Sequence, residues 1–385
     1  MRRDRQLELI QRLLKYQEQG TTAYAPDTYS NELAAYSDPA RFAQEREIFF
    51  RQRPLPFGLS GRIAEPGDFA TDTIDGSPLL VTRDRDGVVH AFLNVCRHRG
   101  APVAEGCGKA KMFACPYHAW IYNLDGSLKG IPDARSFDGL DKAELGLTEV
   151  PSLEKDGMIW VGPLDMKTPM PDDPMGPLSE EFAEWNLGSY HHFGGYRMVQ
   201  PMNWKLVIDP FWEGYYIGVL HKETIAPYLE SNRGTFDAYG DHHRMVVPRN
   251  TFRDLANQPE DERDLITHAA VVYGFFPTSI AVIQGAANFE LWRVWPDQGR
   301  PGWSVVDLAI YVPEEPKTEK ARNFWQKNLD LAIATVEAED FVLGRIIQQN
   351  AENVQQDRTV YGRNEPAMTH YHTRIRSPLG LEATV

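Results

Sequence analysis

CRHRG at 96–100 and CPYHAW at 115–120 decide the fold of this 385-residue chain. Each stretch places a cysteine shortly before a histidine, and sixteen residues separate the two pairs. Two thiolates and two imidazoles on two loops can complete a metal site, so the candidate ligands are Cys96, His98, Cys115 and His118. A structural zinc site uses the same ligand types, and the spacing alone leaves zinc open beside an iron–sulfur cluster.

Short β-branched and aromatic runs surround these two stretches. They begin near Phe57, end near Met158-Ile159-Trp160-Val161, and are separated by turn signals. Asp86-Gly87 and Asp125-Gly126 each stand between two such runs, which is typical of tight hairpins. The pattern predicts a small antiparallel β domain over residues 46–165.

Together with Asn123 and Gly126, the two cysteine–histidine stretches closely resemble the Rieske ferredoxin domain. The resemblance implies that the two cysteines bind one iron of a [2Fe–2S] cluster and the two histidines bind the other. Replacing two thiolates by neutral imidazoles removes negative charge and raises the reduction potential of such a cluster. Cys107 lies between the pairs, matches no ligand position, and is interpreted as a small core or loop residue.

A second motif lies in the C-terminal half, where NWKL at 203–206 precedes DPFWEGYY at 209–216 and LH at 220–221. This order resembles the catalytic segment of Rieske non-haem iron oxygenase α subunits. The resemblance implies that His221 is a ligand of a mononuclear iron. It also implies that Glu213 is a carboxylate bridging to a neighbouring subunit's Rieske histidine. In the same family pattern the carboxylate ligand precedes a glutamine by eight residues, as Asp340 precedes Gln348 here.

The local pattern around Asp340 supports the same assignment. A helical stretch is predicted from about Lys317 to Gln349, and one stripe of it carries Asp340 among apolar residues. A carboxylate on a buried stripe is costly unless it is paired, hydrogen-bonded or bound to a metal. The apolar members of the stripe are Ile333, Val336, Leu343 and Ile347.

Tyr216 departs from the family pattern, because it stands where the first histidine ligand is expected. A phenol has a pKa near 10 and is a poor ligand for ferrous iron at neutral pH. Three interpretations remain open: a subunit without a working iron site, a site completed by another histidine, or a tyrosine-ligated variant. The histidines considered as replacements are His191, His192, His242, His243 and His268.

The expected fold class is α+β, in four segments. An N-terminal helical segment (1–45) precedes the Rieske [2Fe–2S] antiparallel β domain (46–165). A proline-rich linker (166–180) then leads to a catalytic domain (181–385), in which helices cover an antiparallel sheet. Strand-like runs in the last segment are Ser279–Ile283, Phe289–Val294 and Ser304–Tyr311.

Composition excludes several classes of protein. The net charge of −14 argues against nucleic-acid binding, which depends on a basic face. The chain contains no run of eighteen apolar residues, so no membrane-spanning helix is expected. Residues 1–20 form an amphipathic pattern and not a secretion signal. Three cysteines cannot form a disulfide framework, which indicates a reduced, cytoplasmic chain.

The resemblance implies a terminal oxygenase that activates O₂ and mono- or dioxygenates, or demethylates, a small organic substrate, for example an aromatic one. A Gly-x-Gly-x-x-Gly fingerprint is absent from the sequence, so the electrons are expected from a separate ferredoxin or NAD(P)H-dependent reductase. A homotrimer or mixed oligomer is expected. The alternative, which Tyr216 favours, is a non-catalytic electron-relay subunit.

Two further sets of residues are assigned roles from the sequence. Basic residues in and between the ligand pairs are predicted to attract an acidic electron donor: Arg97, Arg99, Lys109 and Lys111. Aromatic residues of the catalytic domain are candidates for an apolar pocket, with core packing expected for most: Phe275, Phe276, Phe289, Trp292 and Trp295.

Overall fold

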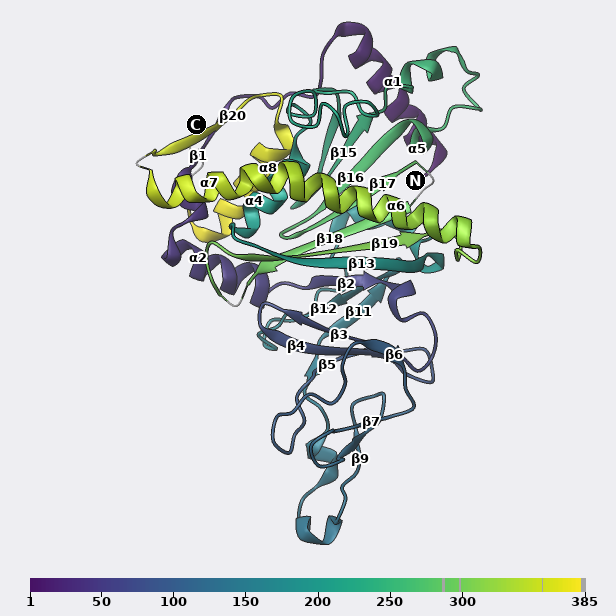
Figure 1. Cartoon of the computed structure of the whole chain (residues 1–385), viewed down its shortest axis with the longest axis vertical. Helices are drawn as coiled ribbons and strands as arrows, with labels where there is room; N and C mark the ends of the chain where they lie inside the picture. Colours follow the sequence, from purple (N-terminus) through teal and green to yellow (C-terminus); the bar gives the residue numbers. More distant parts are fainter. Residues whose placement is uncertain (286–287, 298, 355, 382–385) are drawn as a thin grey trace. The chain divides into compact units, whose positions relative to one another are not determined.

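The computed structural model describes residues 1–285, 288–297, 299–354 and 356–381 (Figure 1). The chain forms two compact units. One contains Met1–Ile48, Met175–Asn186 and Tyr190–Val385, and the other contains Phe49–Pro174 and Leu187–Ser189. We call the first the catalytic unit and the second the cluster unit. Within the described ranges, no helix combines the length and the apolar composition needed to cross a membrane.

The cluster unit consists of short antiparallel strands, as the turn signals predict. Its sheets run in the orders β10-β5-β4-β3-β6, β11-β12-β2 and β7-β8-β9. The predicted Asp-Gly turns connect β4 to β5 and β8 to β9. The strands are β2 (Leu55–Leu59), β3 (Asp68–Ile74), β4 (Ser77–Arg83), β5 (Val89–Leu93), β6 (Cys107–Lys109), β7 (Phe113–Ala114), β8 (Ile121–Tyr122), β9 (Leu128–Gly130), β10 (Glu149–Val150), β11 (Ser152–Lys155) and β12 (Met158–Val161).

Gly126 shows why the second of these turns requires glycine. Its φ of +76° lies in the left-handed region, which L-residues with a side chain rarely adopt. A Cβ atom at this position would also lie 2.3 Å from Cε1 of Phe92. Both the turn and the packing of the cluster unit therefore require a residue without a side chain at position 126.

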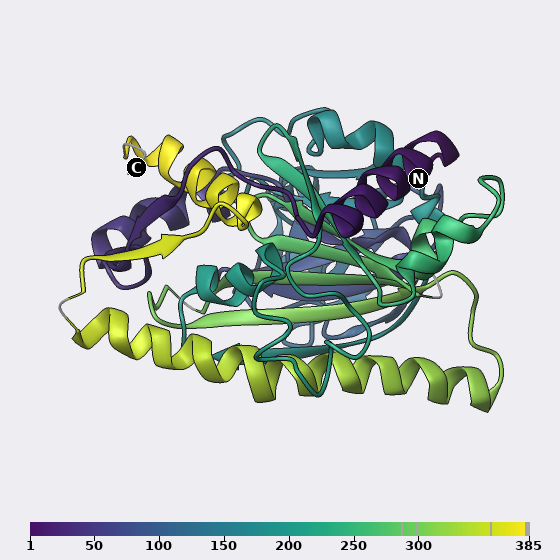
Figure 2. The same cartoon turned by 90° about the horizontal axis from the view of Figure 1, so that it is seen from above.

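The catalytic unit is built on an antiparallel sheet in the order β13-β19-β18-β17-β16-β15-β14. The long C-terminal helices α6 (Glu319–Thr335) and α7 (Phe341–Asn353) follow one another along the sheet (Figures 1 and 2). The expected arrangement of helices over an antiparallel sheet is confirmed. The strands are β13 (His191–Gln200), β14 (Thr235–Tyr239), β15 (His242–Pro248), β16 (Ala269–Phe275), β17 (Ser279–Gln284), β18 (Asn288–Pro296) and β19 (Ser304–Val312), and the shorter helices are α3 (Ser179–Ala183), α4 (Trp204–Ile208), α5 (Leu265–His268) and α8 (Pro366–Arg376).

A π-helical turn, Val336–Asp340, separates α6 from α7. The predicted apolar stripe is wrong beyond this turn, because Leu343 and Ile347 are exposed. The buried residues of α7 are Phe341, Gly344 and Gln348. A π-helical turn holds an extra residue compared with an α-helical turn, so it rotates the following helix relative to an unbroken period of 3.6 residues. Asp340 lies at the end of the turn and is buried.

The first 45 residues are not helical throughout, contrary to the prediction. Helix α1 (Arg3–Gln19) and helix α2 (Pro39–Glu45) flank the strand β1 (Tyr29–Glu32). This strand pairs with β20 (Arg358–Tyr361), more than 320 residues later in the chain. Local periodicity in the sequence cannot predict a strand partner so far along the chain. The range 166–180, expected to be linker, includes a 3₁₀ turn at Gly176–Leu178 and the start of α3.

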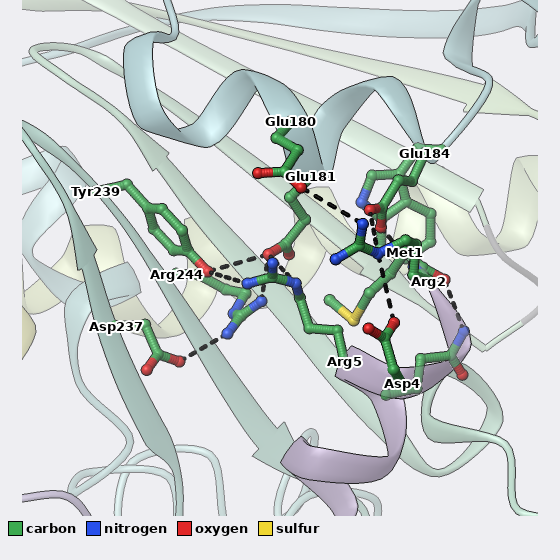
Figure 3. Close-up of polar contacts among 12 residues, drawn as sticks. Met1, Arg2, Asp4, Arg5, Glu180, Glu181, Glu184, Asp237, Tyr239 and Arg244 are labelled. Atoms are coloured by element: carbon green, nitrogen blue, oxygen red, sulfur yellow. Dashed lines mark hydrogen bonds and ion pairs between the residues drawn. The ribbon is translucent and has the colours of Figure 1, made fainter.

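Helix α1 is anchored to the rest of the catalytic unit by ion pairs around Glu181 of α3 (Figure 3). The buried Glu181 carboxylate accepts hydrogen bonds from Arg244 of β15 and, at 3.0 Å, from the Tyr239 hydroxyl. Arg5 of α1 lies 3.5 Å from the same carboxylate. Arg2 pairs with Glu184 at 3.1 Å. The N-terminal helix is therefore an integral part of this unit.

Candidate functional site

Two loops of the cluster unit present Cys96 and Cys115 with the same backbone geometry. The Cys96 N–H donates to the Ala101 carbonyl at 2.8 Å, and the Cys96 carbonyl accepts from Gly100 N at 2.9 Å. The Cys115 N–H donates to the Trp120 carbonyl at 2.9 Å, five residues on, as in the first loop. The Cys115 carbonyl accepts from the N–H four residues on at 2.8 Å. The loops are thus repeats of one turn, and each places a thiol at its start.

His98 and His118 face each other across these loops, with ring centroids 4.5 Å apart. The Nδ1 atoms of both rings are buried and have no hydrogen-bond partner. Both cysteines are buried free thiols in the same apolar cluster. Burial, with the neighbouring His118 and Arg99, lowers the pKa of His98, which favours the neutral ring that binds metals. Two unpartnered imidazole nitrogens and two buried thiols on the same two loops fit a [2Fe–2S] cluster of the Rieske type.

The surroundings of the four side chains are apolar and aromatic. Trp120 stacks on His98 with centroids 5.0 Å apart, and Phe137 packs edge-on against both rings. The Tyr122 hydroxyl lies 3.3 Å from Cys96 Sγ and accepts the Arg97 N–H at 3.0 Å. A hydroxyl beside a ligand sulfur is one of the features that set the potential of an iron–sulfur cluster.

The four basic residues predicted to attract a donor are all exposed. Arg97 and Arg99 belong to the first cysteine–histidine loop, and the Arg99 guanidinium lies 5.9 Å from the Tyr117 ring centroid. Lys109 and Lys111 instead line a separate surface cavity together with Arg85. Cys107 is exposed in β6 and does not belong to the core.

The start of the second motif, NWKL at 203–206, leads into the short helix α4, which is hydrogen-bonded to α7. Asn203 caps this helix by accepting a hydrogen bond from Lys205 N at 3.0 Å. The Asn203 N–H in turn donates to Gln348 Oε1 on α7 at 2.8 Å. The NWKL stretch and the helix that carries Asp340 are thereby tied together. This contact explains how residues from two distant parts of the sequence reach the same site.

His221 lies between two consecutive carboxylates of the π-helical turn. Its Nδ1 is 2.5 Å from Glu339 Oε2, which also accepts a 2.7 Å hydrogen bond from Thr224 Oγ1. Its Nε2 is 3.3 Å from Asp340 Oδ1. Asp340 Oδ1 is buried and has no hydrogen-bond partner. A ring nitrogen facing an unpartnered carboxylate oxygen fits two ligands of one metal ion, with Glu339 orienting the imidazole from behind.

Tyr216 completes this group but does not fit a third ligand. Its ring lies 4.8 Å from the His221 ring, and its hydroxyl donates to the Pro210 carbonyl at 3.1 Å. Burial, together with the carboxylate of Asp340, raises the pKa of Tyr216 well above its usual value. Deprotonation of the phenol to an anionic ligand is therefore costly at neutral pH. The histidines considered as replacements, His191, His192, His242, His243 and His268, do not line this cavity.

These side chains line a cavity of about 210 Å³ between the sheet and the C-terminal helices. Glu213 also lines it, and burial, with a smaller effect of Glu365, raises the pKa of Glu213 to about 7. Of the five aromatic residues proposed for a pocket, Trp292 lines the cavity and the others are buried elsewhere. The volume exceeds the roughly 150 Å³ of a cavity known to hold benzene, so a small organic molecule fits.

Two acidic residues of this site were not identified from the sequence. The signal for Glu339 is its place directly before Asp340, which puts two adjacent acids in a helical stretch. Glu290 lines the cavity from β18, and its signal was a charge inside a strand-like apolar run.

Comparisons with known proteins agree with both halves of this description. The family model of the Rieske [2Fe-2S] domain matches residues 55–152, and that of the ring hydroxylating alpha subunit (catalytic domain) matches 187–380. Choline monooxygenase of Spinacia oleracea is 40% identical over 85% of this chain and 72% of its own length. Choline monooxygenase of Beta vulgaris is 30% identical over 82% of this chain and 69% of its own length.

A solved structure shares the fold over nearly the whole chain. It is described as a quaternary ammonium Rieske monooxygenase that reveals insights into carnitine oxidation by gut microbiota and inter-subunit electron transfer. Its TM-score is 0.77 at 19% identity, covering 93% of this chain and 97% of that one.

Proposed function

Because the chain belongs to the family of Rieske oxygenase α subunits, we propose that it is a terminal oxygenase component. In this proposal a separate ferredoxin or NAD(P)H-dependent reductase delivers electrons one at a time to the cluster unit. The electrons are then used to reduce O₂ in the cavity of the catalytic unit, where a small organic substrate is hydroxylated. The reaction is mono- or dioxygenation, or demethylation through hydroxylation.

The observation that carries this proposal is the pairing of two sites in one chain. In the cluster unit, two unpartnered imidazole nitrogens and two buried thiols lie on the same two loops. In the catalytic unit, His221 and Asp340 face each other at the wall of a cavity large enough for an organic molecule. An electron-accepting centre and an oxygen-activating centre are the two requirements of this chemistry.

The chain's own residues supply orientation and proton control. Cys96, Cys115, His98 and His118 would hold the cluster, which supplies one-electron transfer. Glu339 fixes the ring of His221 through Nδ1 and leaves Nε2 facing the cavity. Glu213 has a pKa of about 7, so it can hold or release a proton near neutral pH.

We also propose that the working protein is an oligomer, a homotrimer or a mixed one. Glu213 is the carboxylate through which the cavity of one subunit would meet the Rieske histidine of the next. Support comes from the description of the structural relative, which names inter-subunit electron transfer. The free cysteines are compatible with the reducing cytoplasm as its location.

Tyr216 favours a second candidate function, an electron-relay or structural subunit of a mixed oligomer. Two fitting donors, His221 and Asp340, are fewer than the three protein ligands of a facial iron triad. A relay subunit would keep the cluster and lack productive mononuclear iron.

Iron and acid-labile sulfide analysis separates the two functions. An oxygenase is expected to hold about three iron atoms for two sulfides, and a relay subunit about two. The protein should be brown and show the reduced-state paramagnetic signal of a histidine-ligated cluster in either case. A colourless chain with stoichiometric zinc would contradict both. Oxygen uptake with a reductase and a candidate substrate then tests turnover directly.

A further inference from the structure

Glu290 is a buried carboxylate in the wall of the catalytic cavity, on strand β18. Its Oε1 accepts hydrogen bonds from Gln284 Nε2 at 3.1 Å and from Asn288 Nδ2 at 3.5 Å. Its Oε2 accepts one from Trp292 Nε1 at 3.2 Å. The guanidinium of Arg249 donates to Oε1 of the Gln284 amide at 3.4 Å and does not pair with Glu290. All the hydrogen-bond donors to Glu290 among the described residues are thus neutral.

Acidic side chains outnumber basic ones in the walls of the cavity. Its walls carry the carboxylates of Glu213, Glu290 and Asp340 against one imidazole, that of His221. Among the described residues that line it, neither lysine nor arginine is present. A buried carboxylate without a counter-ion is unfavourable, and burial accordingly raises the pKa of Glu290. A bound anion would add repulsion, whereas a bound cation would supply the missing positive charge.

The walls next to Glu290 select among cations. Trp292 lies against Phe211 with ring centroids 5.2 Å apart, and Tyr216 adds a third ring to the lining. Aromatic faces attract cations, most strongly where water is excluded. A carboxylate has roughly four acceptor positions, and three of those on Glu290 are already in use. A primary ammonium would leave N–H donors unmet at Glu290, whereas a fully alkylated ammonium has none to satisfy.

We propose that Glu290 is the specificity-determining residue of this cavity and that the ligand it selects is a small organic cation with a quaternary ammonium group. Glu290 supplies the counter-charge, and the rings of Trp292 and Phe211 enclose the alkyl groups. The inference rests on the proposed function in one respect, that this cavity is the substrate site. Binding itself requires no turnover, so the two proposals can fail separately.

Two probes of equal shape test the inference on the purified protein with its native metal content. Choline carries a quaternary nitrogen, and 3,3-dimethylbutan-1-ol carries a neutral carbon at the same position. Calorimetric titration is expected to show choline binding on the order of 10- to 100-fold more tightly than the alcohol, since a buried charge loses its partner in the neutral case. Benzoate, an aromatic anion of similar size, is expected not to bind.

Two variants assign the effect to the proposed residue. Glu290→Gln should lower choline affinity on the order of 10- to 100-fold and leave the weak binding of the alcohol unchanged. Glu337→Gln removes the same charge from a residue outside this cavity and should change neither affinity. Circular dichroism and cluster absorbance verify that both variants are folded.

Several results would overturn the inference. The first is equal affinity of the wild-type protein for choline and the alcohol, which needs no variant to interpret. Absence of choline binding, or preference for benzoate, would do the same. A Glu290→Gln protein that is folded and binds choline normally would show that Glu290 does not determine the binding of the cation. Choline binding without any oxygen uptake would support the cation site while contradicting the oxygenase function.

Discussion

Replacing Tyr216 by histidine should create a working third ligand in the catalytic cavity. The phenol of Tyr216 must lose a proton to become an anionic ligand, and its pKa lies well above its usual value of 10. At pH 7 that deprotonation costs at least three pKa units, or about 4 kcal/mol, which corresponds to roughly 10³-fold in affinity. A neutral imidazole pays no such cost. We therefore expect Tyr216→His to bind ferrous iron at least about 10³-fold more tightly than the wild-type chain.

The measurement is iron per acid-labile sulfide after anaerobic loading with ferrous iron and removal of the excess. Tyr216→His should reach about three irons for two sulfides at a ferrous iron concentration at which the wild type is not yet saturated. Tyr216→Phe, which keeps the ring and removes the hydroxyl, should equal the wild type. Tyr215→His is the matched control, because Tyr215 is 60% exposed and does not line the cavity. It should gain no iron.

One pattern of results would refute this reasoning. If the wild type already holds a third iron, Tyr216→Phe loses it, and Tyr216→His gains nothing, then the phenol is a ligand. If the wild type and Tyr216→Phe both hold a third iron and Tyr216→His gains none, then a group other than Tyr216 completes the site. Either result would remove the main support for a relay subunit.

Three further predictions concern stability, pH and electron delivery. Glu45→Gln should lower the free energy of unfolding by about 3–5 kcal/mol in urea denaturation, because it removes the carboxylate that pairs with the buried side chains of Lys205 and Arg41. A loss under 1 kcal/mol would contradict this. Burial raises the pKa of Glu213 from 4.5 in the unfolded chain to about 7 in the folded chain. Ionisation of this carboxyl therefore destabilises the folded state progressively as the pH rises from 4.5 to 7, and the whole destabilisation is present above pH 7. Glu213→Gln should thus be more stable than the wild type by about 1–3 kcal/mol at pH 8 and nearly equal to it at pH 4.5, and an equal difference at both pH values would argue against the shift. Charge reversal at Lys109 and Lys111 should slow cluster reduction by an acidic ferredoxin on the order of 10-fold at low salt and little at high salt in stopped-flow measurements; an unchanged rate at low salt would exclude docking there.

The closeness of the four proposed cluster ligands was predictable from sequence, because they fall within 23 positions, on two loops that repeat one turn. The catalytic site was harder to predict, because α4 and α7 meet through a contact between Asn203 and Gln348. The late helix was predicted at nearly its observed position. Its buried face was not, since the π-helical turn at Val336–Asp340 shifts the helical phase of α7. Strand β1 was missed because its partner lies at the other end of the chain.

Glu290 shows a further limit of local patterns. Every residue of β18 is buried, so the strand has no polar alternation that would tell one face from the other. The sheet register shows what the sequence does not: Met245, Val272, Val282 and Glu290 are neighbours in one row across β15 to β18. All four line the cavity, and the first three are apolar. An apolar residue would complete this row without the cost of a buried charge. The carboxylate therefore needs a reason outside the packing of the sheet, and a positively charged ligand provides one.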